Sequence, residues 1–200
     1  METDTNTRDK LLALLLKEPF ATHTATSLAK ALNLTRQGVW KSLNKLLDEE
    51  LINFVQVSNT KTGTNLITLN WSNPLTEKTL SLLLTKEALA QKRWRADFAE
   101  LKDNISFLIL FGSILTNSKE ANDIDLLAVV KKEKFKELNK SVQKIQKTQI
   151  KKIHLIDLTD SEFTKELKSG NNAYKDALRK GVILYGQDSF VNFIMSLKNG

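Results

Sequence analysis

Two aspartates one residue apart interrupt an apolar run in the middle of the chain. The segment 110–130 reads LFGSILTNSKEANDIDLLAVV, and its aspartates are Asp123 and Asp125. Side chains two positions apart on a strand project from the same face, so the two carboxylates would lie side by side. Ile124 and Leu126 would then enter the core from the other face. Because buried carboxylates are costly unless a positive charge neutralises them, the pattern predicts a strand with one cation-binding face.

The second half of the chain alternates strand-like and helix-like patterns. Apolar runs bounded by polar segments predict strands at 105–111, 123–130, 150–159 and 182–185. Helical patterns are expected at 133–147 and over most of 161–197. This alternation is typical of an α/β domain, which we place at 105–200.

The first 73 residues follow a different order. Helices are expected from residue 7 to the stop at Pro19, then at 24–33 and 34–50, and two strands at 51–57 and 64–70. Thr24 or Thr26 would cap the second helix, and Thr35 would open the third. Helices followed by a hairpin give the order of a winged helix-turn-helix, and SLAKALNLTRQGVWKSLNKLLDEELI resembles the recognition unit of winged-helix transcription regulators. The resemblance covers residues 7–72.

The third predicted helix has one apolar face and one polar face. Its apolar positions are Val39, Leu43, Leu46 and Leu47. The polar side offers side chains suited to base edges and phosphates, and these candidate DNA-binding residues are Thr35, Arg36, Gln37, Trp40, Lys41 and Lys45, with Lys61 at the tip of the wing. A protein-interaction module, or a polar face that is only solvated, stays open as the alternative. Since many such domains read two half-sites, a homodimer stays open too.

Between these parts, Asn73 and Pro74 precede a long helical pattern at 75–103. It is expected to form either one helix or two, because Thr85 could cap a second segment. We therefore predict a winged-helix domain at 1–73, a helical connector at 74–104 and an α/β domain at 105–200.

Gly112 and Ser113 follow the first strand of the α/β domain. A helix is expected to begin there, and free backbone N–H groups at a helix N-terminus form a phosphate site that glycine lets a phosphate approach. The paired carboxylates suit Mg²⁺, a hard ion that binds carboxylates, water and phosphate oxygens. Together these features indicate in-line transfer of a nucleotidyl group.

FGS, nine residues and then DIDLL resemble the Gly-Ser…Asp-x-Asp signature of DNA-polymerase-β-like nucleotidyltransferases, particularly the minimal domains of prokaryotes. The ending GVILYG is also similar, and the resemblance covers about 105–190. It implies a mixed-sheet nucleotidyltransferase fold in which Gly112 and Ser113 hold the triphosphate of a nucleotide such as ATP. It also implies that Asp123 and Asp125 bind Mg²⁺ or Mn²⁺.

The family usually supplies a third carboxylate from a later strand. In this chain the segment IHLIDL places His154 at the corresponding position. Asp157 lies three positions on, so it should face the other way unless a bulge turns it. His154 could act as a general base, since imidazole titrates near neutral pH. A domain that binds nucleotides without turnover is the alternative.

The net charge of +7 is concentrated in one region, because nine lysines and two glutamates lie between 131 and 152. On the helix expected there, one face carries Lys136, Lys140, Lys144 and Lys147. This lysine stripe could attract a nucleic acid, although a solvated helix face explains it equally simply. The chain has no cysteine, and neither its apolar runs nor its polar N-terminus suggest a membrane span or signal peptide. We expect a soluble cytoplasmic protein.

The sequence thus predicts a two-domain protein that transfers a nucleoside monophosphate from an NTP to an unidentified acceptor, a protein or an RNA, and binds DNA through its winged helix. One alternative is a non-catalytic transcription regulator whose C-terminal domain binds a nucleotide or a partner protein. Another is a component of a toxin–antitoxin system.

Overall fold

A computed structural model describes residues 2–56 and 65–199 of the chain. The chain divides into two compact units, 1–83 and 84–200, and the division falls inside one helix, α4 (Pro74–Ala90). The separate connector predicted at 74–104 stays a prediction.

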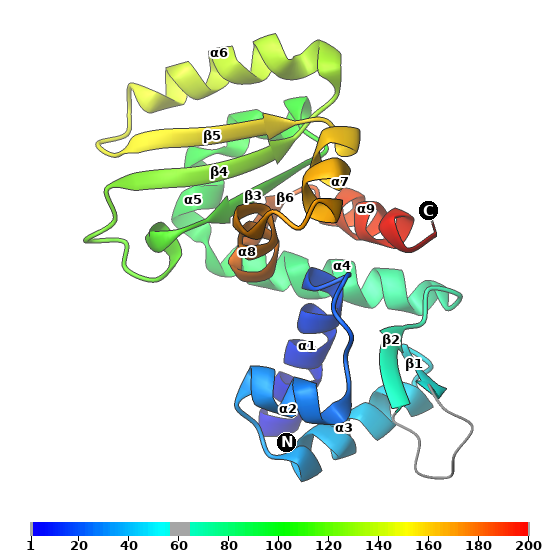
Figure 1. The fold of residues 1–200 in the computed structure, drawn as a ribbon. Helices are drawn as coiled ribbons and strands as arrows, with labels where there is room; N and C mark the ends of the chain where they lie inside the picture. The colour runs from blue at the N-terminus through cyan, green and yellow to red at the C-terminus, as the bar shows by residue number, and fades with distance from the viewer. Residues whose placement is uncertain (1, 57–64, 200) are drawn as a thin grey trace. The chain divides into compact units, whose positions relative to one another are not determined.

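The described residues of the first unit form three helices, a hairpin and the first part of α4 (Figure 1). The helices are α1 (Glu2–Lys17), α2 (Ala25–Leu32) and α3 (Arg36–Asp48), and the antiparallel strands are β1 (Ile52–Gln56) and β2 (Asn65–Leu69). The element order is the one predicted.

Threonines cap two of these helices. The side chain of Thr24 accepts a hydrogen bond from the Ser27 amide at the start of α2. That of Thr35 accepts one from Gly38 at the start of α3. These caps satisfy amides that have no partner within their helix, which explains why the helices begin there.

Apolar residues at helical spacing form the core of the first unit, as predicted. Val39, Leu43 and Leu46 of α3 are fully buried. The prediction that Leu47 joins them is wrong, because 37% of that residue is exposed. Leu47 follows Leu46 by one position, and a rotation of about 100° carries it away from the core-facing stripe.

Helix α4 runs without a break through Thr85, so this threonine does not cap a second helix. The chain turns only at Gln91, after which come α5 (Lys92–Asp97) and the 3₁₀ helix η1 (Ala99–Asn104).

The described part of the second unit holds a four-stranded mixed sheet in the order β5-β4-β3-β6. Its strands are β3 (Phe107–Phe111), β4 (Asp123–Val129), β5 (Lys152–Leu158) and β6 (Val182–Tyr185). Strand β3 is antiparallel to both β4 and β6, whereas β4 and β5 run parallel. A crossover through a helix is required between parallel neighbours, and α6 (Phe135–Gln146) supplies it.

Helices cover both faces of this sheet (Figure 1). Ile124, Leu126 and Ala128 of β4 share one buried cluster with residues of α5, η1 and α6. On the other face, aromatic rings of α7 (Asp160–Lys168) and α9 (Gln187–Asn199) contact Phe107. Helix α8 (Asn172–Lys180) leads into β6.

The prediction of a helix beginning at Gly112 and Ser113 is wrong. A single 3₁₀ turn, η2 (Ser113–Leu115), stands there. The following residues, TNSKEAN, offer no apolar periodicity with which a longer helix could bury a face.

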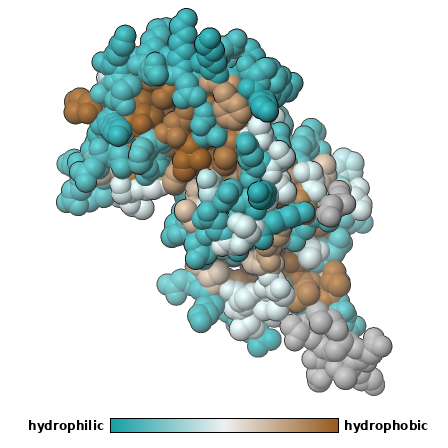
Figure 2. Space-filling view, turned by 45° about the horizontal axis from the view of Figure 1, so that its top comes forward, coloured by the Kyte–Doolittle hydropathy of each residue, from teal (hydrophilic) through white to brown (hydrophobic). Residues whose placement is uncertain are grey.

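Three exposed leucines, Leu75, Leu82 and Leu89, recur every seven residues on α4, and the side shown in Figure 2 is mainly hydrophilic with some apolar areas. Among the helices within 2–56 and 65–199, none has both the length and the apolar character required to cross a membrane.

Candidate active site

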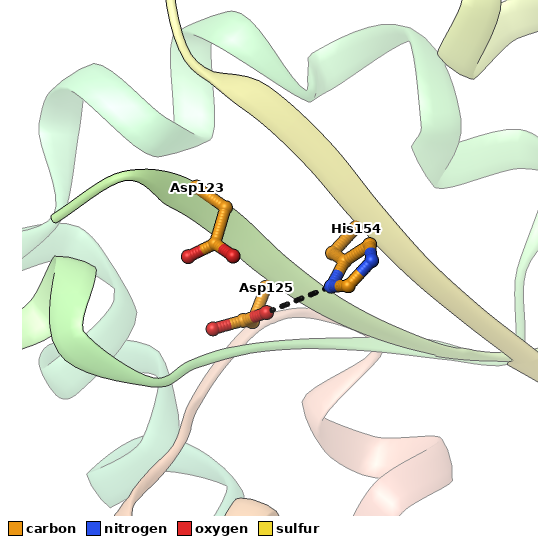
Figure 3. Close-up of side chains that lie close together, drawn as sticks. All are labelled: Asp123, Asp125 and His154. Atoms are coloured by element: carbon orange, nitrogen blue, oxygen red, sulfur yellow. Dashed lines mark ion pairs between the residues drawn. The ribbon is translucent and has the colours of Figure 1, made fainter.

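Asp123, Asp125 and His154 form one cluster on the second unit (Figure 3). The carboxylates project from the same face of β4, and His154 projects beside them from β5. One potential ligand atom from each residue lies within 4.8 Å of the other two. His154 Nδ1 is 3.6 Å from Asp125 Oδ1.

The strand register explains why these three side chains lie close together. Parallel pairing sets Asp123 beside Lys152 and Asp125 beside His154, without interruption as far as Val129 beside Leu158. Paired residues of adjacent strands point to the same face, so the imidazole must lie next to the second carboxylate.

Burial and repulsion raise the pKa of Asp125. Desolvation is the larger cause and the negative charge of Asp123 is the next, while His154 acts in the opposite direction. The side chain of Asp125 is only 22% exposed, whereas that of His154 is 65% exposed. The site therefore holds negative charge that its own protein surroundings do not fully compensate.

Gly112 lies directly against Asp125. Its φ of 82° belongs to the left-handed region that favours glycine. A Cβ built at this position would collide with Asp125 Oδ2. The glycine therefore gives the carboxylate room beside the turn that follows β3.

Two carboxylates and an imidazole within a few ångströms are a donor set that fits a divalent cation. A cation would also relieve the repulsion that raises the pKa of Asp125. Asp123, Asp125 and His154 are the residues that would hold it.

The structure places Asp157 on the opposite face of the sheet. Its Oδ2 accepts a hydrogen bond of 2.8 Å from Asn139 Nδ2 of α6. The register from β4 to β5 has no bulge, so nothing turns Asp157 toward the cluster. His154 is thus the β5 residue that meets the carboxylates.

Two lysines near the site were not predicted from the sequence. Lys152 is exposed and lies on the same face of β5 as His154, beside Asp123. Lys151 donates hydrogen bonds to the backbone carbonyls of Lys119 and Ala121, in the loop that leads to Asp123. The spacing from Lys152 to His154 could have indicated a shared face, but the contact of Lys151 depends on folding.

The predicted DNA-binding residues lie on the first unit. Arg36, Gln37, Lys41 and Lys45 are exposed on α3. Trp40 is half-buried, with its ring 5.6 Å from that of Phe54 at 87°. The Thr35 side chain caps α3, and Lys61 lies outside the described residues. Binding of DNA by this surface stays a prediction.

The lysine stripe lies on the exposed side of α6, and Lys144 forms an ion pair of 3.0 Å with Glu100. Helix α6 covers the face of the sheet opposite to the cluster. A partner bound along the stripe would not contact Asp123 or Asp125 directly.

Comparison with protein families agrees with this geometry. Residues 96–189 match the model of a family described as polymerase beta, nucleotidyltransferase. The match supports a nucleotidyltransferase domain in the second unit and spans all three residues of the cluster. No match to the chain was found among curated proteins or among solved structures.

Proposed function

We propose that the second unit transfers a nucleoside monophosphate from an NTP to an acceptor hydroxyl. The observation that carries this proposal is the paired carboxylates of Asp123 and Asp125, held beside Gly112 within the matched residues. In the reaction, the acceptor oxygen forms a bond to the α-phosphorus and loses its proton. The bond from that phosphorus to the β-phosphate oxygen breaks, and pyrophosphate leaves.

Different residues of the second unit have different roles in the proposed reaction. Asp123 and Asp125 would hold a divalent cation, Mg²⁺ or Mn²⁺, which would supply positive charge where negative charge develops in the transfer. Gly112 lets the triphosphate approach the backbone, and the backbone amide of Ser113, at the start of the turn η2, donates a hydrogen bond to it. Lys152, on the same face, adds a positive charge for the phosphates.

Two roles are open to His154. Neutral imidazole can accept the proton of the acceptor hydroxyl, or its nitrogen can bind the cation. For Nδ1 the two roles exclude each other, because a metal-bound nitrogen has no lone pair left for a proton.

The first unit would bring the enzyme to DNA. This part of the proposal rests on the exposed polar face of α3, with Arg36, Gln37 and Lys41.

A second function has one observation in its favour. Because an imidazole stands where a third carboxylate is expected, the second unit could bind a nucleotide without turnover and regulate DNA binding. In another version of the proposed transfer, the acceptor of the nucleotide is a partner protein, as in a toxin–antitoxin pair.

Thermal unfolding of the full chain tests nucleotide binding. ATP, GTP, CTP and UTP are added in turn, with and without Mg²⁺ or Mn²⁺. A ligand at about 100 times its dissociation constant stabilises a protein by about 2.7 kcal/mol, which a thermal scan detects. We expect a metal-dependent shift that is lost in the double variant Asp123→Asn with Asp125→Asn.

Asp157→Asn is the matched control, since it removes a carboxylate of the adjacent strand β5 from the opposite face of the sheet. It should keep the shift. With an acceptor hydroxyl present, release of one pyrophosphate for each nucleotide transferred then distinguishes transfer from binding alone. An unchanged shift in the double variant would refute the assignment of the site.

A further inference from the structure

His154 makes this site chemically different from an all-carboxylate one. Its imidazole lies 3.6 Å from Asp125, and the three side chains form the one group of this kind within the described ranges 2–56 and 65–199. We propose that His154 is the third metal ligand, and that it makes the site select a divalent transition ion, with Zn²⁺ as the probe, over Mg²⁺. This inference rests on the proposed function, because it concerns the same site.

The distances suit ligation by all three residues. Bonds of about 2.0–2.2 Å to a metal ion place two donors of one ion no more than about 4.4 Å apart. The donor atoms of the cluster lie within 4.8 Å of one another, so small side-chain rotations suffice. The His154 side chain is 65% exposed and can make such a rotation without displacing the core.

The fold fixes which residue supplies the third donor. Uninterrupted parallel pairing holds His154 beside Asp125, and Asp157 is turned away toward Asn139. A carboxylate from β5 therefore cannot replace the imidazole unless the register changes. The preference for one metal ion over another therefore depends on the strand register that holds His154 in place as well as on the imidazole itself.

The chemistry of the donors gives the direction of the preference. Mg²⁺ demands oxygen ligands and loses its water reluctantly, whereas imidazole suits the later transition ions such as Zn²⁺. An imidazole in place of a carboxylate also leaves the site with one negative charge fewer. The lost charge weakens the binding of every divalent ion. A transition ion regains affinity through its bond to the imidazole nitrogen, whereas Mg²⁺ does not.

Metal binding to the full chain, stripped with a chelator, tests the proposal without any activity measurement. Electron paramagnetic resonance reports free Mn²⁺, and displacement of bound Mn²⁺ by Zn²⁺ or by Mg²⁺ gives the affinity for each ion. We expect wild type to bind Zn²⁺ about tenfold or more tightly than Mg²⁺, and His154→Asp to reduce that ratio about tenfold. Asp157→Asn should leave the ratio unchanged.

A spin-echo experiment on the bound Mn²⁺ gives the direct readout, since a ligating imidazole modulates the echo through its nitrogen. The modulation should be present in wild type and in Asp157→Asn, and absent in His154→Asp. The chain has only one other histidine, His23, which is buried in the first unit, so the assignment is unambiguous.

The outcomes separate the two proposals. Equal affinity for both ions, with no nitrogen modulation, overturns the role of His154. The proposed function survives that result if both ions still support nucleotide binding that Asp123→Asn with Asp125→Asn abolishes. If wild type binds no divalent ion with or without an NTP, the proposed function itself fails.

Discussion

At the scale of single residues, Gly112 and Asp125 depend on each other. The carboxylate occupies the space that a Cβ at position 112 would take, and the backbone of Gly112 has a positive φ. A larger residue there would have to displace Asp125, and any L-residue would strain the turn. The glycine thus acts on the geometry of the carboxylate as well as on access for a phosphate.

Gly112→Ala should therefore lower the affinity for Mn²⁺. Displacement of a metal-binding carboxylate by its neighbour is expected to cost about 10- to 100-fold, comparable to the loss of an outer-shell contact. Gly170→Ala is the matched control, because Gly170 also has a positive φ but a Cβ there meets only Lys175 Nζ at 3.7 Å. Both variants should lose about 1 kcal/mol or more of stability from backbone strain. Equal metal affinity in the two variants would contradict the prediction.

The charge of Asp125 should cost stability when no metal is present. Burial and Asp123 raise its pKa in the folded protein, so the folded state favours the neutral acid. The ionised group therefore opposes folding at pH values above its folded pKa. As pH falls below the ordinary value of 3.8, the carboxyl is protonated in both states and the cost disappears.

Asp125→Asn should accordingly raise the melting temperature at neutral pH in the presence of a chelator. The gain should shrink as the pH approaches 3.8. The variant also loses the ion pair with His154, which acts against the gain. Thermal unfolding over a pH series measures it. A melting temperature that falls at neutral pH would show that the ion pair outweighs the desolvation and repulsion.

At the scale of elements, local periodicity predicted most of the fold. The period of two in β4 correctly put Asp123 and Asp125 on one face and Ile124 in the core. Thr35 was correctly assigned as the cap of α3. The errors, an absent helix after Ser113 and an exposed Leu47, lie at element ends, where a few local residues do not decide whether a turn continues or which side is covered.

The candidate site was predictable only in part. The spacing of the two aspartates revealed their shared face, and the family resemblance led to His154. The roles of Lys151 and Lys152 depend on which strand pairs with β4 and in which register, and no local pattern encodes that pairing. Long-range contacts of this kind arise from the whole sheet.

One such contact joins two elements around the site. Lys151, directly before β5, donates hydrogen bonds to carbonyls of the loop before β4. Lys151→Met keeps the aliphatic stem and removes the donor, so the loop should become more mobile and Asp123 less well positioned. We expect metal affinity to fall about tenfold, as for the loss of an outer contact of a ligand.

Lys140→Met is the control for charge, since Lys140 is exposed on α6, over the opposite face of the sheet. Hydrogen exchange at residues 117–122 would report the loosening of the loop directly. Unchanged exchange and unchanged affinity in Lys151→Met would show that the loop holds its position without the lysine.

At the scale of the whole molecule, the chain forms two compact units with different chemistry on each. The carboxylate cluster belongs to the second unit, and the exposed polar face of α3 belongs to the first. If the units work as separate modules, damage to one surface should leave the binding function of the other intact.

Arg36→Ala with Lys41→Ala should weaken binding to a fluorescent mixed-sequence DNA duplex and leave Mn²⁺ and nucleotide binding unchanged. Loss of two phosphate contacts should reduce the slope of log affinity against log salt by about 2. Lys10→Ala with Lys78→Ala removes the same charge from exposed sites elsewhere in the first unit and is the matched control. An equal reduction in both double variants would mean that net charge, and not the α3 face, binds DNA. Loss of nucleotide binding together with DNA binding would show that the two units act as one.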